Sequence, residues 1–311
     1  MSAAIPKVNI LLSTYNGARF LWEQLDSLQS QDYPNISIYV RDDGSTDNTI
    51  SLLQEYQAKY PNMKLATGKN VGYIRSFYEL VHSCGGNDNE LYAFCDQDDV
   101  WEPQKISRSV AMIQASLDPS MTVYFSRMKL VDENLQQFGL SSNPRFIDFG
   151  STLMGISYGC TVVFSSGVRR LFLEANPSNM LAHDWWVCLI AASFGHLVYD
   201  IQPQVQYRHH GSNTTAGYRA NFFQRLKFRM KEVIERFFYK KPTVDFLQQS
   251  KQFMATYNNI SSEKRVVVEE LVALKGKNFL SRLHYVFAPK VYTNDSLDNA
   301  ALKLMIILGC H

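Results

Sequence analysis

Short apolar runs and amphipathic segments alternate along the first 135 residues of the chain. The runs rich in β-forming residues cover residues 7–15, 36–44, 63–69 and 91–99. The segments with apolar residues at helical spacing cover residues 18–31, 46–60, 73–84 and 104–117. We expect Thr46 or Asp47 to cap the second of these helices. This order predicts an α/β fold, with a mostly parallel sheet flanked by helices on both faces.

The pattern changes twice after this region. Residues 136–216 are more irregular, although "HDWWVCLIAASFG" (183–195) predicts a buried helix. From about residue 218 the pattern becomes helical with a basic face. We therefore predict a nucleotide-binding and catalytic domain over 1–217 and a helical C-terminal extension over 218–311, with the boundary near Gly217.

Polar clusters follow three of the predicted strands at the points where they end. These clusters are "STYNG" after the first strand, "RDDGSTD" after the second and "CDQDD" after the run at 91–95. Ligands bind at the carboxyl ends of the strands in sheets of this kind. The sequence therefore predicts a binding site lined by carboxylates.

Composition limits the classes of partner. The 311 residues are 46% hydrophobic and 13% aromatic, with a net charge of +2, which predicts a substantial core and no nucleic-acid binding. Five scattered cysteines without metal-type spacing indicate reduced thiols in the cytoplasm. No apolar run approaches 18 residues and the first residues lack a signal-peptide pattern, so we expect no membrane span and no leader.

The stretch "CDQDDVWEP" places Asp96, Asp98 and Asp99 within four positions. Ionised carboxylates this close repel one another unless a cation lies between them. Oxygen ligands suit Mg²⁺ or Mn²⁺, and Mg²⁺ commonly completes its shell with phosphate oxygens. A nucleoside diphosphate is therefore the expected partner. The alternative is a turn that caps a helix beginning near Pro103, which would explain one aspartate but not three.

Other nucleotide enzymes lack support in the sequence. No GxGxxG follows the first strand, and the chain has no GxxxxGK[ST]. A glycine-rich nucleotidyltransferase loop is also missing. The phosphates would then be held by metal and carboxylates rather than by a loop of backbone amides.

Four segments carry a resemblance to a known family. "VNILLSTYNGARFLWEQLDSLQSQ", "IYVRDDGSTDNT", "FCDQDDVW" and "HDWW" resemble the family 2 glycosyltransferases, which have the A-type nucleotide-sugar fold (GT-A). The resemblance extends over residues 7 to about 215 and is strongest to bacterial rhamnosyltransferases of surface-polysaccharide assembly. "YRHHGSN" is similar to that group as well, where the commoner family form has glutamine before the histidine.

The resemblance implies roles for the donor-side residues. Tyr15 would stack on the nucleotide base with Ser13 beside it, and Asp43 would accept a hydrogen bond from the base, with Asp42 as its neighbour. Asp96 would lie toward the ribose. Asp98 would bind the metal ion. Asp99 is expected either to contact the ligands of the metal ion or to lie on the acceptor side.

The resemblance also implies a general base and supporting residues. Asp184 matches the position of the base in an inverting transfer, and it also suits the start of a helix, two roles that are compatible. Trp185 and Trp186 form either a platform for a sugar or part of the core. His210 is expected near the metal or diphosphate, with weaker cases for the adjacent His209 and Arg208.

Arg75 follows "NVGY" and is expected either at a phosphate or on a solvated helix face.

The implied reaction is a metal-dependent, inverting transfer from a nucleoside diphosphate sugar to a hydroxyl of a lipid-linked glycan. The expected donor is dTDP-rhamnose, on resemblance alone, and a UDP-hexose or UDP-N-acetylhexosamine is the alternative. A catalytically silent binding module is a further alternative, and the intact carboxylates argue against it. A nucleotidyltransferase is another, and the missing glycine-rich loop argues against it.

Residues 218–242 have eight basic and two acidic residues, with apolar positions at helical spacing. Such a helix either lies on an anionic membrane surface or packs its apolar side on the catalytic domain. We accordingly expect a cytoplasmic protein, peripheral on the inner face of the membrane if the first interpretation holds. The terminal segment "SLDNAALKLMIILGC" would dock in the same way or form a homodimer contact.

Overall fold

The computed structural model of the protein describes residues 5–211, 222–239 and 246–311. Its strands are β1 (Lys7–Thr14), β2 (Ile36–Asp42), β3 (Met63–Thr67), β4 (Glu90–Cys95), β5 (Val100–Trp101), β6 (Thr122–Val131), β7 (Gln137–Leu140), β8 (Val163–Ser165) and β9 (His196–Arg208). The helices before residue 212 are α1 (Leu21–Gln29), α2 (Thr49–Lys59), α3 (Tyr73–Ser83), α4 (Lys105–Gln114), α5 (Phe149–Thr152), α6 (Ser166–Glu174) and α7 (His183–Phe194). The later helices are α8 (Phe222–Tyr239), α9 (Phe246–Thr256), α10 (Ser262–Ala273), α11 (Phe279–Phe287) and α12 (Ser296–Leu308).

The strands form one mixed sheet in the order β3-β2-β1-β4-β8-β6-β9-β5, with β7 paired to β6. The first four strands pair in parallel, as the alternation of strands and helices predicts. The later strands add antiparallel pairs, among them β4 with β8 and β6 with β8. The predicted α/β class is thus confirmed.

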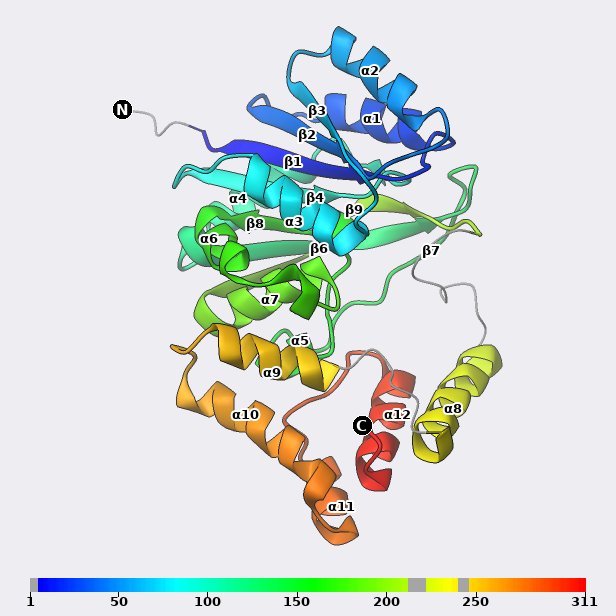
Figure 1. The fold of residues 1–311 in the computed structure, drawn as a ribbon, viewed down its shortest axis with the longest axis vertical. Helices are drawn as coiled ribbons and strands as arrows, with labels where there is room; N and C mark the ends of the chain where they lie inside the picture. The colour runs from blue at the N-terminus through cyan, green and yellow to red at the C-terminus, as the bar shows by residue number, and fades with distance from the viewer. Residues whose placement is uncertain (1–4, 212–221, 240–245) are drawn as a thin grey trace. The chain divides into compact units, whose positions relative to one another are not determined.

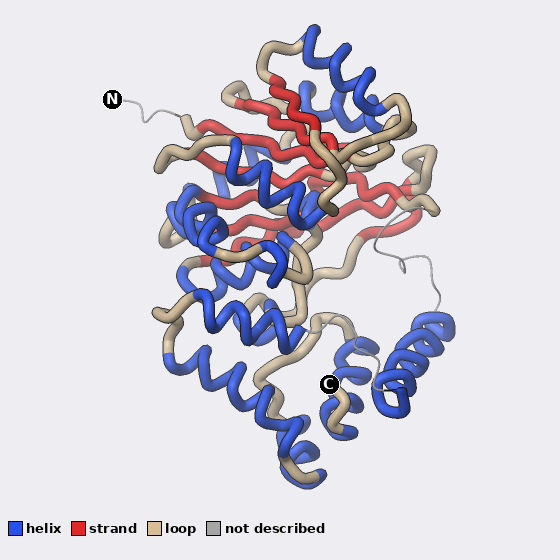
Figure 2. Tube along the Cα trace, viewed as in Figure 1, coloured by secondary structure: helices blue, strands red, loops and turns tan. Residues whose placement is uncertain are grey.

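Helices cover the sheet on both faces. Figure 1 shows α3 and α6 side by side on the face toward the viewer and α4 behind the sheet, and Figure 2 separates these helices from the strands by colour. The central strands are buried on both sides, since every residue of β4 is buried. Continuous burial of this kind explains why β4 is an unbroken apolar run rather than an alternating one.

The start of α2 differs from the prediction. The helix begins at Thr49 with Asn48 at its cap position, so neither Thr46 nor Asp47 is the N-cap residue. Asp47 still stabilises the first turn, because its Oδ1 accepts hydrogen bonds from the Thr49 amide at 3.0 Å and from the Thr49 hydroxyl at 2.5 Å. A polar run of several capping residues does not reveal from sequence which of them the backbone uses.

The aspartates of residues 96–99 do not cap a helix. The helix after them, α4, begins at Lys105 with Gln104 at its cap position and no side-chain hydrogen bond at the cap. The helix-capping alternative for this cluster is therefore wrong, and the three carboxylates need another explanation.

A second compact unit contains residues 144–156 together with residues 213–311, and the remainder of the chain up to 212 forms the first. Asn294 joins the two parts of the second unit, because its Oδ1 accepts hydrogen bonds from the amides of Arg145 and Phe146 at 2.8 and 2.9 Å. The predicted boundary at Gly217 lies outside the described residues. Across the ranges that the structure describes, every helix is too short or too polar to cross a membrane.

Candidate functional site

The loops after β1, β2 and β4 meet at one edge of the sheet. The strand register aligns Thr14 with Asp42 and Leu12 with Cys95, so the three strands end at nearly the same level. The loops are also joined directly, since the Tyr15 amide donates to Gln97 Oε1 at 2.8 Å and Gln97 Nε2 donates back to the Tyr15 carbonyl at 3.1 Å. The three predicted polar clusters therefore lie together.

Asp42 holds the loop after β2 in shape. Its carboxylate is fully buried and accepts hydrogen bonds from the Thr14 hydroxyl at 2.9 Å and from the Gly44 and Ser45 amides at 3.1 and 2.8 Å. Because protein donors occupy both of its oxygens, Asp42 shapes the turn rather than facing a ligand.

Asp43 is buried as well, with a different set of donors. Its Oδ1 accepts from the Arg41 guanidinium at 2.5 Å and from the Val71 amide at 2.9 Å, and its Oδ2 accepts from the Gly72 amide at 2.9 Å. Sequence reasoning missed Arg41, which also pairs with Glu79 at 2.7 Å. The sequence signal that could have indicated Arg41 is its position directly before the acidic pair Asp42 and Asp43.

Ser13 and Tyr15 lie beside this carboxylate group at the end of β1. The Ser13 hydroxyl is 2.6 Å from the Ser76 hydroxyl on α3. The side chain of Tyr15 is 47% exposed, so one face of its ring is available to a flat ligand. Arg75 is not part of the cluster, because its exposed side chain pairs with Glu79 on the same helix at 3.3 Å.

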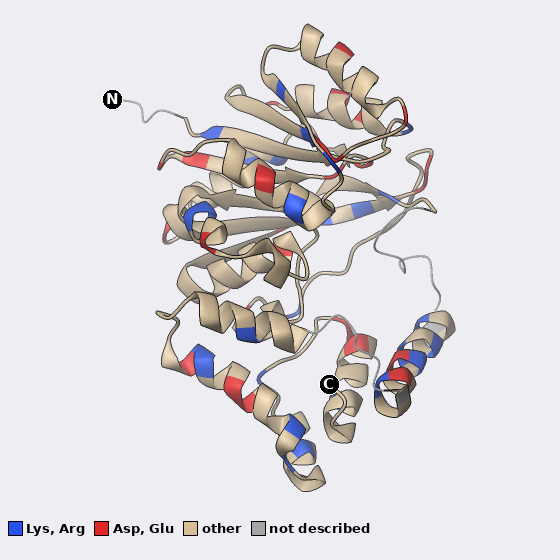
Figure 3. Ribbon diagram, in the orientation of Figure 1, with Lys and Arg blue, Asp and Glu red and all other residues tan. Residues whose placement is uncertain are grey.

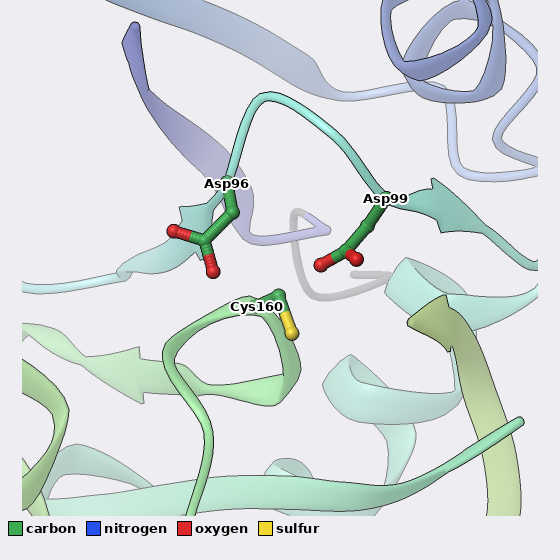
Figure 4. A group of neighbouring side chains, drawn as sticks. All are labelled: Asp96, Asp99 and Cys160. Carbon is green, nitrogen blue, oxygen red and sulfur yellow. The ribbon is translucent and has the colours of Figure 1, made fainter. Parts of the chain in front are cut away.

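The loop 96–99 carries its carboxylates in two directions. Asp96 and Asp99 come from its two ends and approach Cys160 from the turn at Gly159–Thr161, with all three potential ligand atoms within 4.8 Å of one another (Figure 4). Asp98 points to the end of β9, where its Oδ2 is 2.9 Å from His210 Nε2.

Arg208 fastens this loop to β9. Its amide donates to Asp99 Oδ1 at 3.0 Å and its Nε donates to the Asp98 carbonyl at 2.9 Å. The fully buried guanidinium also lies over the Phe20 ring, 4.5 Å from the centroid. Arg208 thus fixes the position of the acidic loop through these hydrogen bonds. The neighbouring His209 contacts the rings of Phe138 and Tyr207 instead.

Mutual repulsion and burial perturb the acidic groups. Burial, together with the charges of Asp98 and Asp184, raises the pKa of Asp96 to about 7. Burial, together with the charges of Asp98 and Asp96, holds the pKa of Asp99 well above its ordinary range. Burial likewise raises the pKa of the Cys160 thiol well above its usual value. Carboxylates crowded in this way are a typical signature of a ligand or cation site.

These residues fit a hard divalent cation. Asp99 Oδ2 is buried and has no hydrogen-bonding partner within the described chain. Carboxylate oxygens of Asp96, Asp98 and Asp99 are the ligands that Mg²⁺ and Mn²⁺ prefer. A protonated Cys160 sulfur does not suit such an ion, so the thiol is a neighbour of the site rather than a candidate ligand.

A buried lysine lies under the acidic loop. Lys105 is fully buried at the start of α4, with its Nζ 3.0 Å from the centroid of the Trp101 ring. Burial lowers the pKa of Lys105 to about 7, against the opposing effect of nearby Asp99 and Asp96. Sequence reasoning missed this residue, because a lysine at a helix start is ordinarily expected in solvent.

Asp184 lies in the first turn of α7 and is almost fully buried. The Ser157 hydroxyl is 3.5 Å from its Oδ2, and burial raises the pKa of Asp184 to about 7. The charge of Asp184 acts on Asp96, which brings the two predicted site residues into one electrostatic group. The adjacent Trp186 is fully buried in the core, whereas Trp185 is half-buried.

His183 and Tyr73 support this corner of the site and were not foreseen. The His183 ring stacks on Phe77 at 4.0 Å and meets Phe94 edge-on at 4.4 Å, and burial lowers its pKa to about 3, so it is a neutral packing residue. Tyr73 is 47% exposed, and its pKa is raised by burial and by the charges of Asp184 and Asp96. Its phenol is therefore within electrostatic reach of both the predicted base and the acidic loop.

Known structures with this architecture include two glycosyltransferases. S. aureus TarS 1–349 in complex with UDP-GlcNAc aligns with a TM-score of 0.56 at 16% identity, covering 97% of this chain and 90% of that one. The mannosyltransferase PcManGT from Pyrobaculum calidifontis, in complex with GDP-Man and Mn²⁺, aligns with a TM-score of 0.53 at 14% identity, covering 99% and 86%. These likenesses confirm the GT-A fold.

Sequence comparison identifies the family. The dTDP-rhamnosyl transferase RfbG of Shigella flexneri is 26% identical over 247 residues, or 74% of this chain and 81% of that protein. An uncharacterized glycosyltransferase of Nostoc sp., alr2836, is 28% identical over 67% of this chain and 66% of its own length. The model of glycosyl transferase family 2 matches residues 9–172, more than half of the chain. The protein is therefore a glycosyltransferase and belongs to glycosyl transferase family 2.

Proposed function

We propose that the protein is an inverting, metal-dependent rhamnosyltransferase that uses dTDP-rhamnose. Its acceptor would be a hydroxyl of a growing lipid-linked polysaccharide such as O-antigen, capsule or cell-wall glycan, reached from the cytoplasmic side of the membrane. The observation that carries the proposal is the buried Asp184 at the start of α7, within the electrostatic reach of the acidic loop 96–99. The similarity to RfbG supports rhamnose as the sugar and dTDP as the nucleotide.

The donor would bind along the edge of the sheet in the first unit. We assign base stacking to the exposed ring of Tyr15, with Ser13 beside it, and a base hydrogen bond to Asp43. Asp96 would face the ribose. We assign catalysis to the domain before residue 217 and treat residues 218–311 as a separate extension.

Asp98 would hold the cation with His210 beside it, supported by the 2.9 Å separation of Asp98 Oδ2 from His210 Nε2. When bound, a divalent cation would neutralise charge on the departing diphosphate. Mg²⁺ and Mn²⁺ both suit the carboxylate oxygens of Asp98. The Mn²⁺ in the PcManGT structure supports the same chemistry.

Asp184 would act as the general base. Its carboxylate would take the proton from the acceptor hydroxyl as that oxygen forms a bond to the anomeric carbon. The bond between this carbon and the diphosphate oxygen breaks on the opposite face, which inverts the configuration and releases the nucleoside diphosphate. A carboxyl whose pKa lies at about 7 is well matched to this task near neutral pH. We assign contact with the sugar to the half-buried Trp185, and Tyr73 is within electrostatic reach of Asp184.

A UDP-hexose or UDP-N-acetylhexosamine donor is the second candidate, and the UDP-GlcNAc in the TarS structure favours it. A catalytically silent module has less support, since a protein without turnover has no need of Asp98 and a buried Asp184 together. A nucleotidyltransferase would release pyrophosphate instead of a nucleoside diphosphate, which product analysis distinguishes.

The experiment that tests the proposal is slow donor hydrolysis by the purified protein across a panel of nucleotide sugars. We expect dTDP release from dTDP-rhamnose and none from UDP-sugars. UDP release from a UDP-sugar would overturn the rhamnose assignment while keeping the reaction class. If no donor is hydrolysed, calorimetry with each donor and Mn²⁺ decides, because the absence of any binding would contradict the proposal.

A further inference from the structure

Helix α8 presents an apolar stripe to solvent. Six of its apolar side chains are highly exposed, and all but Phe228 (64%) lie on one side: Phe223 (77%), Met230 (42%), Ile234 (45%), Phe237 (45%) and Phe238 (70%). At 3.6 residues per turn these five fall within an arc of roughly 100° on one side of the helix. We define these five residues as the α8 stripe.

The opposite side of α8 is charged and faces α12 within the same unit. Arg225 pairs with Asp295 at 2.8 Å, and Arg229 pairs with Asp298 at 2.7 Å. One turn further along, Val233 joins a small core with Ala301 and Met305 of α12. A surface helix ordinarily buries its apolar side and exposes its charges, so α8 has the reverse arrangement.

Exposed positive charge flanks the α8 stripe. Lys227 and Lys231 are both exposed on the same side of the helix. The nearest carboxylate to Lys231 is that of Glu235 at 3.8 Å, and the lysine side chain remains 72% exposed. Both glutamates of α8 are half-buried, with side chains 23% and 28% exposed, and Figure 3 shows where the charges of α8 lie.

We propose that the α8 stripe, with Lys227 and Lys231, docks in the plane of an anionic lipid bilayer. Aromatic and aliphatic side chains would enter the headgroup region while the two lysines contact lipid phosphates. The sequence alone overstates the basic charge available for this contact, because Arg225 and Arg229 are neutralised within the unit. Insertion of the apolar side chains would therefore contribute most of the affinity.

A second copy of the chain fits this surface less well. In a two-fold symmetric dimer the same patch meets itself. The lysines of one helix would then face the lysines of the other, with only the half-buried carboxylates of Glu232 and Glu235 on α8 to receive them. Lipid phosphates supply the missing negative charge. This inference concerns a surface outside the catalytic domain and does not depend on the identity of the donor.

The test is co-sedimentation of the full-length protein with vesicles of phosphatidylcholine alone and of phosphatidylcholine with phosphatidylglycerol. The stripe variant carries Met230→Ser, Ile234→Ser and Phe238→Ser together. The matched control is Phe228→Ser, which removes an equally large side chain that is 64% exposed on another side of the same helix. A charge variant carries Lys227→Glu and Lys231→Glu.

We expect the unmodified protein to bind the anionic vesicles and the stripe variant to bind them at least about tenfold more weakly. Phe228→Ser should bind like the unmodified protein, and the charge variant should lose about tenfold or more on anionic vesicles only. Equal binding by the stripe variant, or no binding by the unmodified protein, would overturn the proposal.

A stripe variant that turns a dimer into a monomer in light scattering, with vesicle binding unchanged, would assign the surface to a second copy and overturn it too. Donor hydrolysis by all variants should equal that of the unmodified protein, so a failed catalytic proposal and a failed docking proposal give different results.

Discussion

Asp184 carries the chemistry of the account, and its surroundings have opposing effects on its charge. The start of α7 favours a carboxylate, because helix N-termini carry partial positive charge. Burial opposes ionisation and dominates, which raises the pKa of Asp184 to about 7. A group in this state can exchange a proton near neutral pH, as a general base must.

Replacing Asp184 with asparagine keeps the shape of the side chain and removes its ability to take a proton. We expect Asp184→Asn to bind the donor as the unmodified enzyme does and to lose at least about a hundredfold in transfer rate. Calorimetry with donor and a transfer assay measure the two effects separately. Transfer at an undiminished rate would show that the base is another residue.

The same substitution should change how stability depends on pH. The folded pKa of Asp184, about 7, lies above the ordinary value of 3.8, so the folded state binds this proton more tightly than the unfolded state does. Its contribution to stability is complete below pH 4 and is lost as the pH rises toward 7. The loss is on the order of 4 kcal/mol at most.

We therefore expect Asp184→Asn to gain in free energy of unfolding, relative to the unmodified protein, between pH 4 and pH 7. Denaturant unfolding of both proteins at several pH values measures this difference. A constant difference across that range would show that burial does not perturb Asp184.

Asp98 and His210 provide the corresponding test of the cation site. We expect Asp98→Ala to lose metal-dependent turnover while the protein keeps its melting temperature, because the Asp98 side chain is partly exposed and contributes little to the core. His210→Ala should weaken Mn²⁺ binding by about tenfold or more. The control Arg75→Ala alters a charge outside the cluster and should leave both properties unchanged. Full turnover by Asp98→Ala would remove the basis for the cation assignment.

At this scale, sequence reasoning found the residues whose chemistry appears in local motifs. Asp43, Asp98 and Asp184 lie at strand or helix ends that periodicity alone predicts. Sequence reasoning missed Arg41 and Lys105, because their importance depends on burial beside carboxylates that a local sequence pattern does not reveal. The burial of Trp186 and the partial exposure of Trp185 likewise depend on how α7 packs.

At the scale of elements, the loop between β2 and α2 connects the fold with the donor site. Gly44 adopts a φ of +82° and lies so close to the loop at 68–70 that an added Cβ would be 3.0 Å from the Asn70 amide nitrogen and 3.1 Å from the Gly68 carbonyl oxygen. Gly72 has the same φ of +82° but open space around its Cα. A side chain would therefore be crowded at Gly44, whereas at Gly72 only the backbone conformation would oppose it.

We expect Gly72→Ala to cost about 1–3 kcal/mol of stability, because a φ of +82° with a ψ of 154° lies in a backbone region that is essentially restricted to glycine. Gly44→Ala should cost more, because it adds crowding against backbone atoms that cannot rotate away. Urea denaturation of the two variants measures both values. Equal losses of stability in the two variants would mean that the loop at 68–70 moves away easily and does not hold the turn at Gly44 in place.

Apart from the two-residue strand β5, the strands and helices before residue 117 could be predicted, because their periodicities are strong and their connections short. The start of α2 could not, because several consecutive residues can cap a helix. The short strands β5, β7 and β8 were also not foreseen, since two to four residues are too few to show a period, and their pairing depends on contacts with distant strands.

At the scale of the whole molecule, the chain contains two compact units that the sequence order does not separate cleanly. Residues 144–156 belong with the C-terminal residues through contacts such as that of Asn294 with Arg145 and Phe146. A contact over nearly 150 positions leaves no local signal. The orientation of α8 was similarly beyond sequence, because an amphipathic pattern does not reveal which side faces solvent.

The most direct test of the central claim is the dependence of donor turnover on a divalent cation. Release of dTDP from dTDP-rhamnose by the purified full-length protein should stop in EDTA and return when Mn²⁺ or Mg²⁺ is added in excess. That result would support a cation held by the acidic loop at the carboxyl ends of β1, β2 and β4. Undiminished release of dTDP in EDTA would contradict the account, because the crowded carboxylates of residues 96–99 would then need a different explanation.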